Sequence, residues 1–170
     1  MIYLQAFVLW RVGMTITYRF KRSLSLLVCS VGLLLSVYLA VIGYVVAPLL
    51  FDTLSDQEAG KLVGQLLHSA NWVVLTGLLV LLVIKWIGYR GLHSLWMLVV
   101  AFMFTAISHF GLSPKMQSIK ESVGYELVHS SAQWREFMMW HGLYQLLFLS
   151  LILLLVVWSI RNLNSLLDRT

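Results

Sequence analysis

Apolar residues along this chain fall into four long runs with short polar segments between them. The runs cover about residues 25–47, 66–84, 92–112 and 137–160. A helix needs about 20 apolar residues to cross the hydrocarbon core of a bilayer, and each run is near that length. The pattern therefore predicts an all-α fold, an integral membrane four-helix bundle, in which residues 1–170 form a single membrane domain.

Residues 1–22 carry basic and aromatic side chains interleaved, a mixture that is typical of the headgroup layer. We expect an interfacial N-terminal arm formed by Tyr3, Phe7, Trp10, Tyr18 and Phe20 together with Arg11, Arg19, Lys21 and Arg22. The segment MTITYRFKRS is a conventional basic leader, so translation could begin at Met1 or at Met14. The apolar run that follows is too long for the h-region of about 7 to 15 residues in a cleaved signal peptide.

Small residues recur on one face of the first apolar run. They stand four, four, three and four positions apart, at Gly32, Ser36, Ala40, Gly43 and Ala47. Small side chains let helix backbones approach closely in lipid, where packing rather than expulsion of water drives association. This stripe predicts the face of the first span that packs against the rest of the bundle.

The stretch from Val45 to Gly60 separates the first and second spans. Pro48 lacks a backbone donor and biases the preceding residue away from the helix, so we expect the first span to end there. Ser55 and Glu58 have the spacing of a capping box, in which each side chain satisfies a free backbone N–H at a helix start. The second helix should therefore begin near Asp56, outside the bilayer.

A short outer surface helix is expected between the third and fourth spans. Ser113 followed by Pro114 is a favourable pair for the N-cap and the first helical position. Apolar residues then recur at helical spacing, at Met116, Ile119, Val123 and Leu127. Polar residues occupy the other positions, and this amphipathic pattern predicts a helix that rests on the membrane surface.

The composition argues strongly against a water-soluble fold. The chain is 60% hydrophobic and 11% charged, with a mean hydropathy of +0.86, whereas about 25% of residues are charged in an average soluble domain. The single cysteine, Cys29, lies inside an apolar run, so there is no disulfide framework.

Basic residues are divided unevenly between the two sides that four crossings would create. One side, which includes both termini, would hold Arg11, Arg19, Lys21, Arg22, Lys85, Arg90, Arg161 and Arg169, and the other Lys61, Lys115, Lys120 and Arg135. The positive-inside rule then predicts that both termini lie in the cytoplasm. We expect the protein in the inner membrane of a bacterial cell. The net charge of +5 reflects this topology and anionic lipid, so we expect the lipid bilayer as a partner and no nucleic acid.

Several residues taken together resemble a known family. They are Gly43, Ala47, Pro48, Phe51, Leu54, Ala59 and Gly60 around the first connection, the later Pro114, and the pair His141 and Gly142 that opens the last span. Their order across four spans resembles the small four-span membrane family that includes transmembrane protein 205 and its bacterial relatives, over about residues 25–160. The resemblance implies a four-helix integral membrane protein, and the bacterial members are largely without assigned function. Relatives often carry a small hydroxyl residue after this pair, where Tyr144 or Gln145 stands here.

Polar residues inside the apolar runs fall into one predicted layer. They are His68 and Asn71 in the second span, Thr105, Ser108 and His109 in the third, and Met138, His141 and Gln145 in the fourth. Each set shares one helical face and lies within about two or three turns of the outer interface. Polar groups in lipid are functional candidates by default because their burial is costly. We therefore expect three helices to converge on an outer polar layer.

This layer has more than one interpretation. Histidine, asparagine and glutamine often join membrane helices through hydrogen bonds worth about 1 kcal/mol each, so the layer could be structural. Imidazole also binds zinc or copper, and thioether binds copper(I). A metal site would use His68, His109 and His141, with Met116, Met138 or Met139 as soft ligands. Two of these histidines on different helices could instead ligate haem b.

The sequence carries no signature of an enzyme. There is no phosphate-binding glycine loop, no hydrolase elbow and no pair of carboxylates within a span. We therefore expect a multi-pass protein of unassigned molecular function, a small binding, scaffold or accessory protein without a cofactor. Its candidate partners are a second copy of the chain or another membrane protein. The alternative is a metal- or haem-binding protein that uses the outer histidines.

Overall fold

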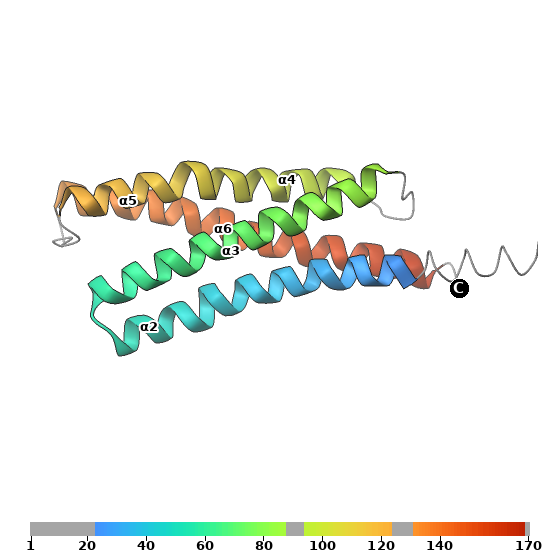
Figure 1. The fold of residues 1–170 in the computed structure, drawn as a ribbon, viewed down its shortest axis with the longest axis horizontal. Coiled ribbons are helices and arrows are strands. Elements are labelled where there is room, and N and C mark those ends of the chain that lie inside the picture. Colours follow the sequence, from blue (N-terminus) through green and yellow to red (C-terminus); the bar gives the residue numbers. More distant parts are fainter. Residues whose placement is uncertain (1–22, 88–93, 124–130, 169–170) are drawn as a thin grey trace, which may run out of the picture.

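Four long helices form the molecule in the computed structural model, which describes residues 23–87, 94–123 and 131–168. They are Ser23–Thr53, Asp56–Trp86, Leu95–Ser122 and Ala132–Leu167, and each is long and apolar enough to cross a membrane. Figure 1 shows the four lying side by side, with successive helices running in opposite directions. The predicted all-α four-helix bundle is confirmed. The predicted N-terminal arm at residues 1–22 lies outside the described residues.

The first span is one helix with a local change of register. Residues 23–41 are α-helical, η1 (Ile42–Val46) is a π-helical segment, and α2 (Ala47–Thr53) follows without a break. The prediction that Pro48 ends this span is therefore wrong. In η1 the N–H of Ala47 bonds to the carbonyl of Ile42, five residues back. A π turn of this kind lets neighbouring N–H groups satisfy the carbonyls that a proline cannot reach.

The third span has the same construction. It consists of α4 (Leu95–Ala106), the π-helical segment η2 (Ile107–Leu112) and α5 (Ser113–Ser122). Ser113 has helical torsions, φ −59° and ψ −49°, so it does not act as an N-cap. The helix predicted after Pro114 is present, but it continues the third span along the bundle instead of forming a separate surface element.

Serine caps fix where the other two helices begin. Ser55 accepts a hydrogen bond from the N–H of Glu58 at 3.4 Å and donates to Glu58 Oε2 at 2.7 Å. The predicted start of α3 (Asp56–Trp86) is confirmed. Ser131 accepts from the N–H of Trp134 at 3.0 Å and opens α6 (Ala132–Leu167), which is longer at both ends than the predicted fourth span.

The stripe of small residues in the first span packs against the rest of the bundle, as predicted, and at Gly32 and Gly43 its neighbour is α6. A Cβ added to Gly32 would collide with Ser159 and would meet the Trp158 ring at 3.0 Å, and one added to Gly43 would meet the Phe148 ring at 2.5 Å. Ser36 is buried between these two positions. The close approach that small residues permit is therefore used here for packing of helix on helix.

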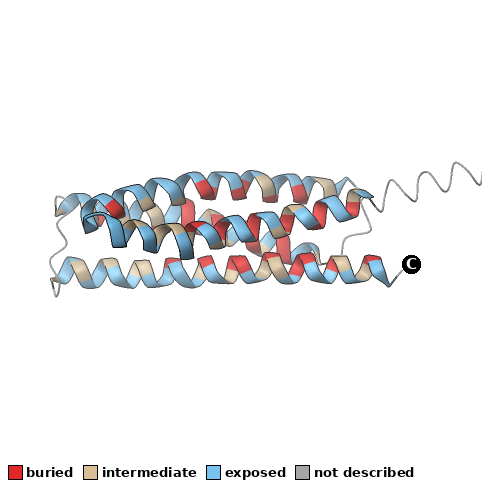
Figure 2. Ribbon diagram, turned by 90° about the horizontal axis from the view of Figure 1, so that it is seen from below, coloured by how far each residue is buried: buried red, intermediate tan, exposed pale blue. Residues whose placement is uncertain are grey.

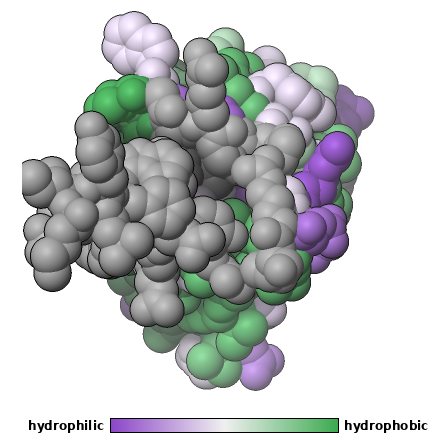
Figure 3. All heavy atoms as spheres, turned by 90° about the vertical axis from the view of Figure 1, so that its right-hand side faces the viewer, coloured by the Kyte–Doolittle hydropathy of each residue, from purple (hydrophilic) through white to green (hydrophobic). Residues whose placement is uncertain are grey.

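Buried residues are concentrated on the inward faces of the four helices (Figure 2). Outward-facing residues are mostly apolar and exposed, as at Leu34, Leu79, Leu146 and Leu153. Figure 3 looks along the bundle from the end opposite α5, and green hydrophobic side chains lie below and at the upper left of the grey atoms, with purple hydrophilic ones on the right. An apolar exterior of this extent is suited to lipid rather than to water.

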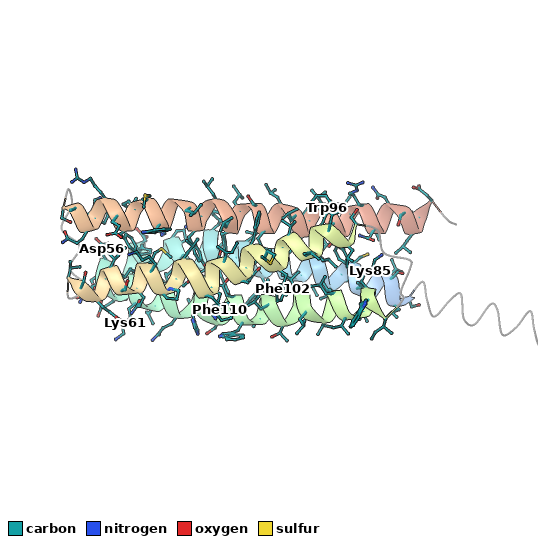
Figure 4. All side chains as sticks on the ribbon, turned by 90° about the horizontal axis from the view of Figure 1, so that it is seen from above. Asp56, Lys61, Lys85, Trp96, Phe102 and Phe110 are labelled. Carbon is teal, nitrogen blue, oxygen red and sulfur yellow. The ribbon has the colours of Figure 1, made fainter. Side chains whose placement is uncertain are left out.

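The two ends of the bundle differ in their side chains. We call the end formed by α2, the start of α3, α5 and the start of α6 the α5 end. Asp56 and Lys61 lie at this end, while Lys85 and Trp96 lie at the opposite end (Figure 4). The 31 residues of α3 span about 46 Å, which exceeds a hydrocarbon core of about 30 Å. The polar first turns of α3 therefore extend beyond the apolar part of the bundle.

Candidate polar site at the α5 end

His68 and His109 lie side by side between α3 and η2. Their ring centroids are 4.7 Å apart, and the ring planes are tilted by 40°. His68 stands about three turns into α3, and His109 is near the middle of η2. Two of the three histidines predicted to share a layer are thus neighbours across a helix interface.

Aromatic side chains surround the ring of His109. Trp72 approaches it edge-on with centroids 4.9 Å apart, and Phe110 does so at 4.6 Å. Both aromatic residues are exposed on the outside of the bundle, whereas His109 is only 5% exposed. His68 is exposed and leaves one side of the pair open.

The Nδ1 atom of His109 is buried and has no hydrogen-bond partner among the described residues. Leaving a buried polar atom unsatisfied costs about 1–3 kcal/mol. The described residues contain three other such side-chain atoms, Trp140 Nε1, Trp158 Nε1 and Ser159 Oγ, and His109 Nδ1 is the one on an imidazole. An atom of this kind indicates either a tolerated packing defect or a group that binds something.

A hydrogen bond joins α3 to α6 nearby. Asn71 Nδ2 donates to the hydroxyl of Tyr144 at 3.3 Å, and both residues are almost fully buried. The ring of Tyr144 stacks on Phe148 with centroids 6.1 Å apart, and Phe148 is the residue that faces Gly43. This bond therefore links the polar layer to the packed interface between the first span and α6.

The hydroxyl of Thr105 serves its own helix. It donates to the carbonyl of Ala101 at 2.8 Å, an arrangement that satisfies a buried hydroxyl without a partner on another helix. Ser108, one residue before His109, is also buried. Thr105 therefore has a local structural role within α4.

His141 belongs to a different cluster on α6. Its ring stacks on Phe137 with centroids 5.7 Å apart, and its Nε2 lies 3.5 Å from Gln145 Nε2. The ammonium of Lys120 lies 5.2 Å from the centroid of the Phe137 ring and donates to the carbonyl of Gly60 at 3.3 Å. This cluster joins α5 to α3 and α6.

The predicted set of three histidines is therefore brought together only in part. His68 and His109 meet, while His141 has other neighbours. Within the ranges that the structure describes, no three residues drawn from His, Cys, Asp and Glu are grouped to hold a metal ion. Of the proposed soft ligands, Met138 and Met139 are exposed and Met116 packs against the core. Metal binding by the histidines stays a prediction.

Sequence reasoning missed two residues of this region. The sequence pattern did not place Tyr144 in the polar layer, although it stands three positions after His141 inside an apolar run. Lys120 was counted only as a charge, although it follows Ile119, the buried residue of α5. A tyrosine within a span and a lysine beside a buried position were the available signals.

The family model described as Domain of unknown function (DUF4149) matches residues 30–124. The chain belongs to the DUF4149 family. The DUF4149 match contains both π-helical segments and their prolines, and it ends before α6 begins. It therefore includes His68, Asn71 and His109 but excludes His141 and Tyr144.

No curated protein matches the chain. No solved structure matches it either.

Proposed function

We propose that this DUF4149 protein is a small binding or accessory protein of a bacterial inner membrane, with no catalytic role, and that it engages its partner through the α5 end. The observation that carries the proposal is the buried polar layer at that end. His109, Asn71 and Tyr144 are buried there, and the other buried polar residues of the described chain are mainly serines, at Ser25, Ser36, Ser108 and Ser159, together with Thr105 and Asn162. Polar groups inside spans are expensive and commonly mark function.

The α5 end faces outward in this proposal, and both termini lie in the cytoplasm. Support comes from the acidic residues that gather at this end, Asp52, Asp56, Glu58, Glu121 and Glu136. Basic residues stand at this end too, at Lys61, Lys115, Lys120 and Arg135, but the sequence places eight on the side of the termini, and the positive-inside rule puts the cytoplasm on the side with more.

Within the broader relationship, we propose that the chain is a bacterial relative of transmembrane protein 205. The support is the order of Pro48, Pro114 and the pair His141 and Gly142 across the four spans. The DUF4149 match covers the first two of these features.

The contacting element in this proposal is α2, and its partner is a second copy of the chain or another membrane protein. None of the residues of α2 is buried, and Leu49 and Phe51 are 58% and 46% exposed. Apolar side chains that project beyond the packed core offer area for contact with another helix.

Reporter fusions test the orientation. Fusions after Arg90 and Thr170 should report the cytoplasm, and a fusion after Gln57 should report the outside. The reverse pattern would overturn the orientation and the outward position of the α5 end together.

Site-specific photo-crosslinking in intact membranes tests the partner. A photoreactive amino acid in place of Phe51 should give an adduct of one defined mass. The matched control is Leu153, which is similarly exposed at 54% but lies on the side of α6. Equal yields at both positions, or no adduct at Phe51, would contradict a partner at α2.

The approach of His68 to His109 favours a second candidate function, a metal- or haem-binding protein. Copper, zinc and haem b are the candidate ligands. Purified protein separates the two functions, because a Soret band or stoichiometric metal by elemental analysis would reject the accessory role without a cofactor.

A further inference from the structure

We propose that His68 and His109 form a two-histidine site for copper(I), without His141. This inference rests on the second candidate function and makes it specific, because it names the two ligands, excludes the third histidine and selects one ion. It places the site on the outside of the bundle, between α3 and η2.

The geometry of the pair is compatible with one shared ion. A metal ion holds an imidazole nitrogen at about 2 Å, so two ligating nitrogens lie at most about 4 Å apart. The ring centroids are 4.7 Å apart with a tilt of 40°, whereas a linear arrangement of two imidazoles around copper(I) places the centroids about 6 Å apart. The exposed ring of His68 would therefore turn outward when the ion binds. The rings come from two helices, α3 and the third span, so binding would also join these helices.

The unsatisfied atom supplies a second and independent observation. Nδ1 of His109 is buried and has no hydrogen-bond partner in the described part of the chain. The residue as a whole is 5% exposed. A bound cation would use a nitrogen lone pair that otherwise has no interaction. The π-helical segment that carries His109 adds weight, because π turns occur frequently at functional sites.

The ligand set selects copper(I) over zinc. Structural zinc sites use four protein ligands and catalytic ones use three, whereas the described residues offer only two ligating side chains here. Copper(I) is a monovalent ion that accepts two-coordinate geometry, and imidazole is a suitable ligand for copper. A single charge is also less costly than a double charge to hold beside apolar surroundings.

The exposed side of the pair is at His68. Trp72 and Phe110 cover the ring of His109, with ring centroids 5.9 Å apart, while His68 is exposed at the surface. The ion would therefore meet His68 first and His109 second. His68 lies about 18 Å along α3 from its first residue, which places it towards the α5 end of that helix.

The test is a titration of full-length protein in detergent with copper(I) under reducing conditions, in competition with a chromophoric copper(I) chelator. Wild-type protein should take one copper per chain from the chelator. The variants His68→Ala and His109→Ala should each lose this binding. The matched control is His141→Ala, which removes a histidine of the same end and should keep the stoichiometry of the wild type.

Each result decides the proposal. Retention of binding by His68→Ala or His109→Ala would overturn it, and so would an equal loss in His141→Ala or no binding by wild-type protein. Far-UV circular dichroism and gel filtration show whether a variant is folded. If His109→Ala does not fold, X-ray absorption of the wild-type complex replaces it, and a first shell other than two nitrogen atoms would sink the two-histidine site.

This experiment is separate from the tests of orientation and partner. Copper binding in detergent does not depend on which end faces outward or on a contact at α2. Loss of the copper site would leave the accessory role intact, and a reversed topology would leave the copper site intact.

Discussion

The π-helical segments η1 and η2 are built alike and are placed in different surroundings. Each ends two residues before a proline, with Val46 before Pro48 and Leu112 before Pro114. In both cases the helix continues past the proline instead of ending. In both spans, the π-helical turn allows the helix to continue past a proline, which cannot donate a backbone hydrogen bond.

The two segments differ in what they bury. The buried residue of η1 is Ile42, whereas η2 buries Ser108 and His109 together with Leu112. After η1, α2 has no buried residue. After η2, α5 buries Ile119 and forms an exposed ion pair with α6, between Lys115 and Glu136 at 3.1 Å. A π turn beside a proline is therefore not by itself a sign of a site, and the buried polar groups distinguish η2.

The largest expected effect comes from the glycine of each segment. Gly43→Ala should lower the free energy of unfolding by about 1–3 kcal/mol, because the new Cβ would meet the buried Phe148 ring at 2.5 Å. Gly111→Ala should leave it unchanged or raise it by up to about 1 kcal/mol, because nothing lies within 4 Å and alanine favours the helix. Unfolding by sodium dodecyl sulfate measures both, and equal losses would show that the two segments are not packed differently.

The prolines test whether η2 alone positions a ligand. Pro114→Ala supplies an N–H that can restore the ordinary α-helical register, so His109 should rotate relative to His68. We expect the copper(I) affinity to fall about tenfold, the scale of changes that disturb how a ligand is held. Pro48→Ala should leave the affinity unchanged, because η1 carries no ligating side chain. A similar fall in copper(I) affinity for Pro114→Ala and Pro48→Ala would mean that η2 has no special role in positioning the ligand.

A smaller effect is expected for the hydrogen bond between Asn71 and Tyr144. A double-mutant cycle with Asn71→Ala and Tyr144→Phe should give a coupling energy of about 0.6 kcal/mol, the average for such bonds between membrane helices. The bond is buried, at 3.3 Å, so its loss should appear in unfolding rather than in copper binding. A coupling energy of zero would mean that the polar layer does not join α3 to α6 through this pair.

The smallest effects concern the helices that follow the two prolines. Hydrogen exchange should be faster in α2 than in α5, because α2 has no buried residue. Lys120→Met should raise exchange in α5 by releasing the carbonyl of Gly60. Lys115→Ala should raise hydrogen exchange in α5 less than Lys120→Met does, since an exposed ion pair contributes only about 0.2–1 kcal/mol. Faster exchange in α5 than in α2 would reverse the comparison.

Much of the fold could be predicted because its signals are local. The length of the apolar runs determines the four spans, and the capping box of Ser55 and Glu58 marks the start of α3. The stripe containing Gly32 and Gly43 indicates the packed face of the first span because small residues at helical spacing have that use in lipid.

The prolines were misread for a physical reason. A proline and a preceding serine are helix boundaries in an isolated chain, but in a span each exposed carbonyl is costly, and a local π turn is less costly than an open end. The sequence therefore shows that the backbone hydrogen-bond pattern is disturbed near Pro48 and Pro114. It does not show whether the helix ends there or continues through a π turn.

The candidate site was predicted only in part because periodicity assigns a residue to a face of its own helix. It does not say which neighbouring helix that face meets. His68 and His109 meet across α3 and η2, while His141 on α6 turns to Phe137 and Gln145. The sequence also does not predict that Nδ1 of His109 is buried without a hydrogen-bond partner, because Trp72 and Phe110 come from two different helices to surround the ring.

Cys29 is the single cysteine of the chain, and at 2% exposure it is shielded inside the bundle. Thiol reagents should therefore react poorly with the unmodified protein. A cysteine introduced at an exposed position would be the dominant reactive thiol, without prior removal of a native one. Membrane-impermeant maleimides and paired spin labels could thus map sidedness and distances between helices in the natural sequence.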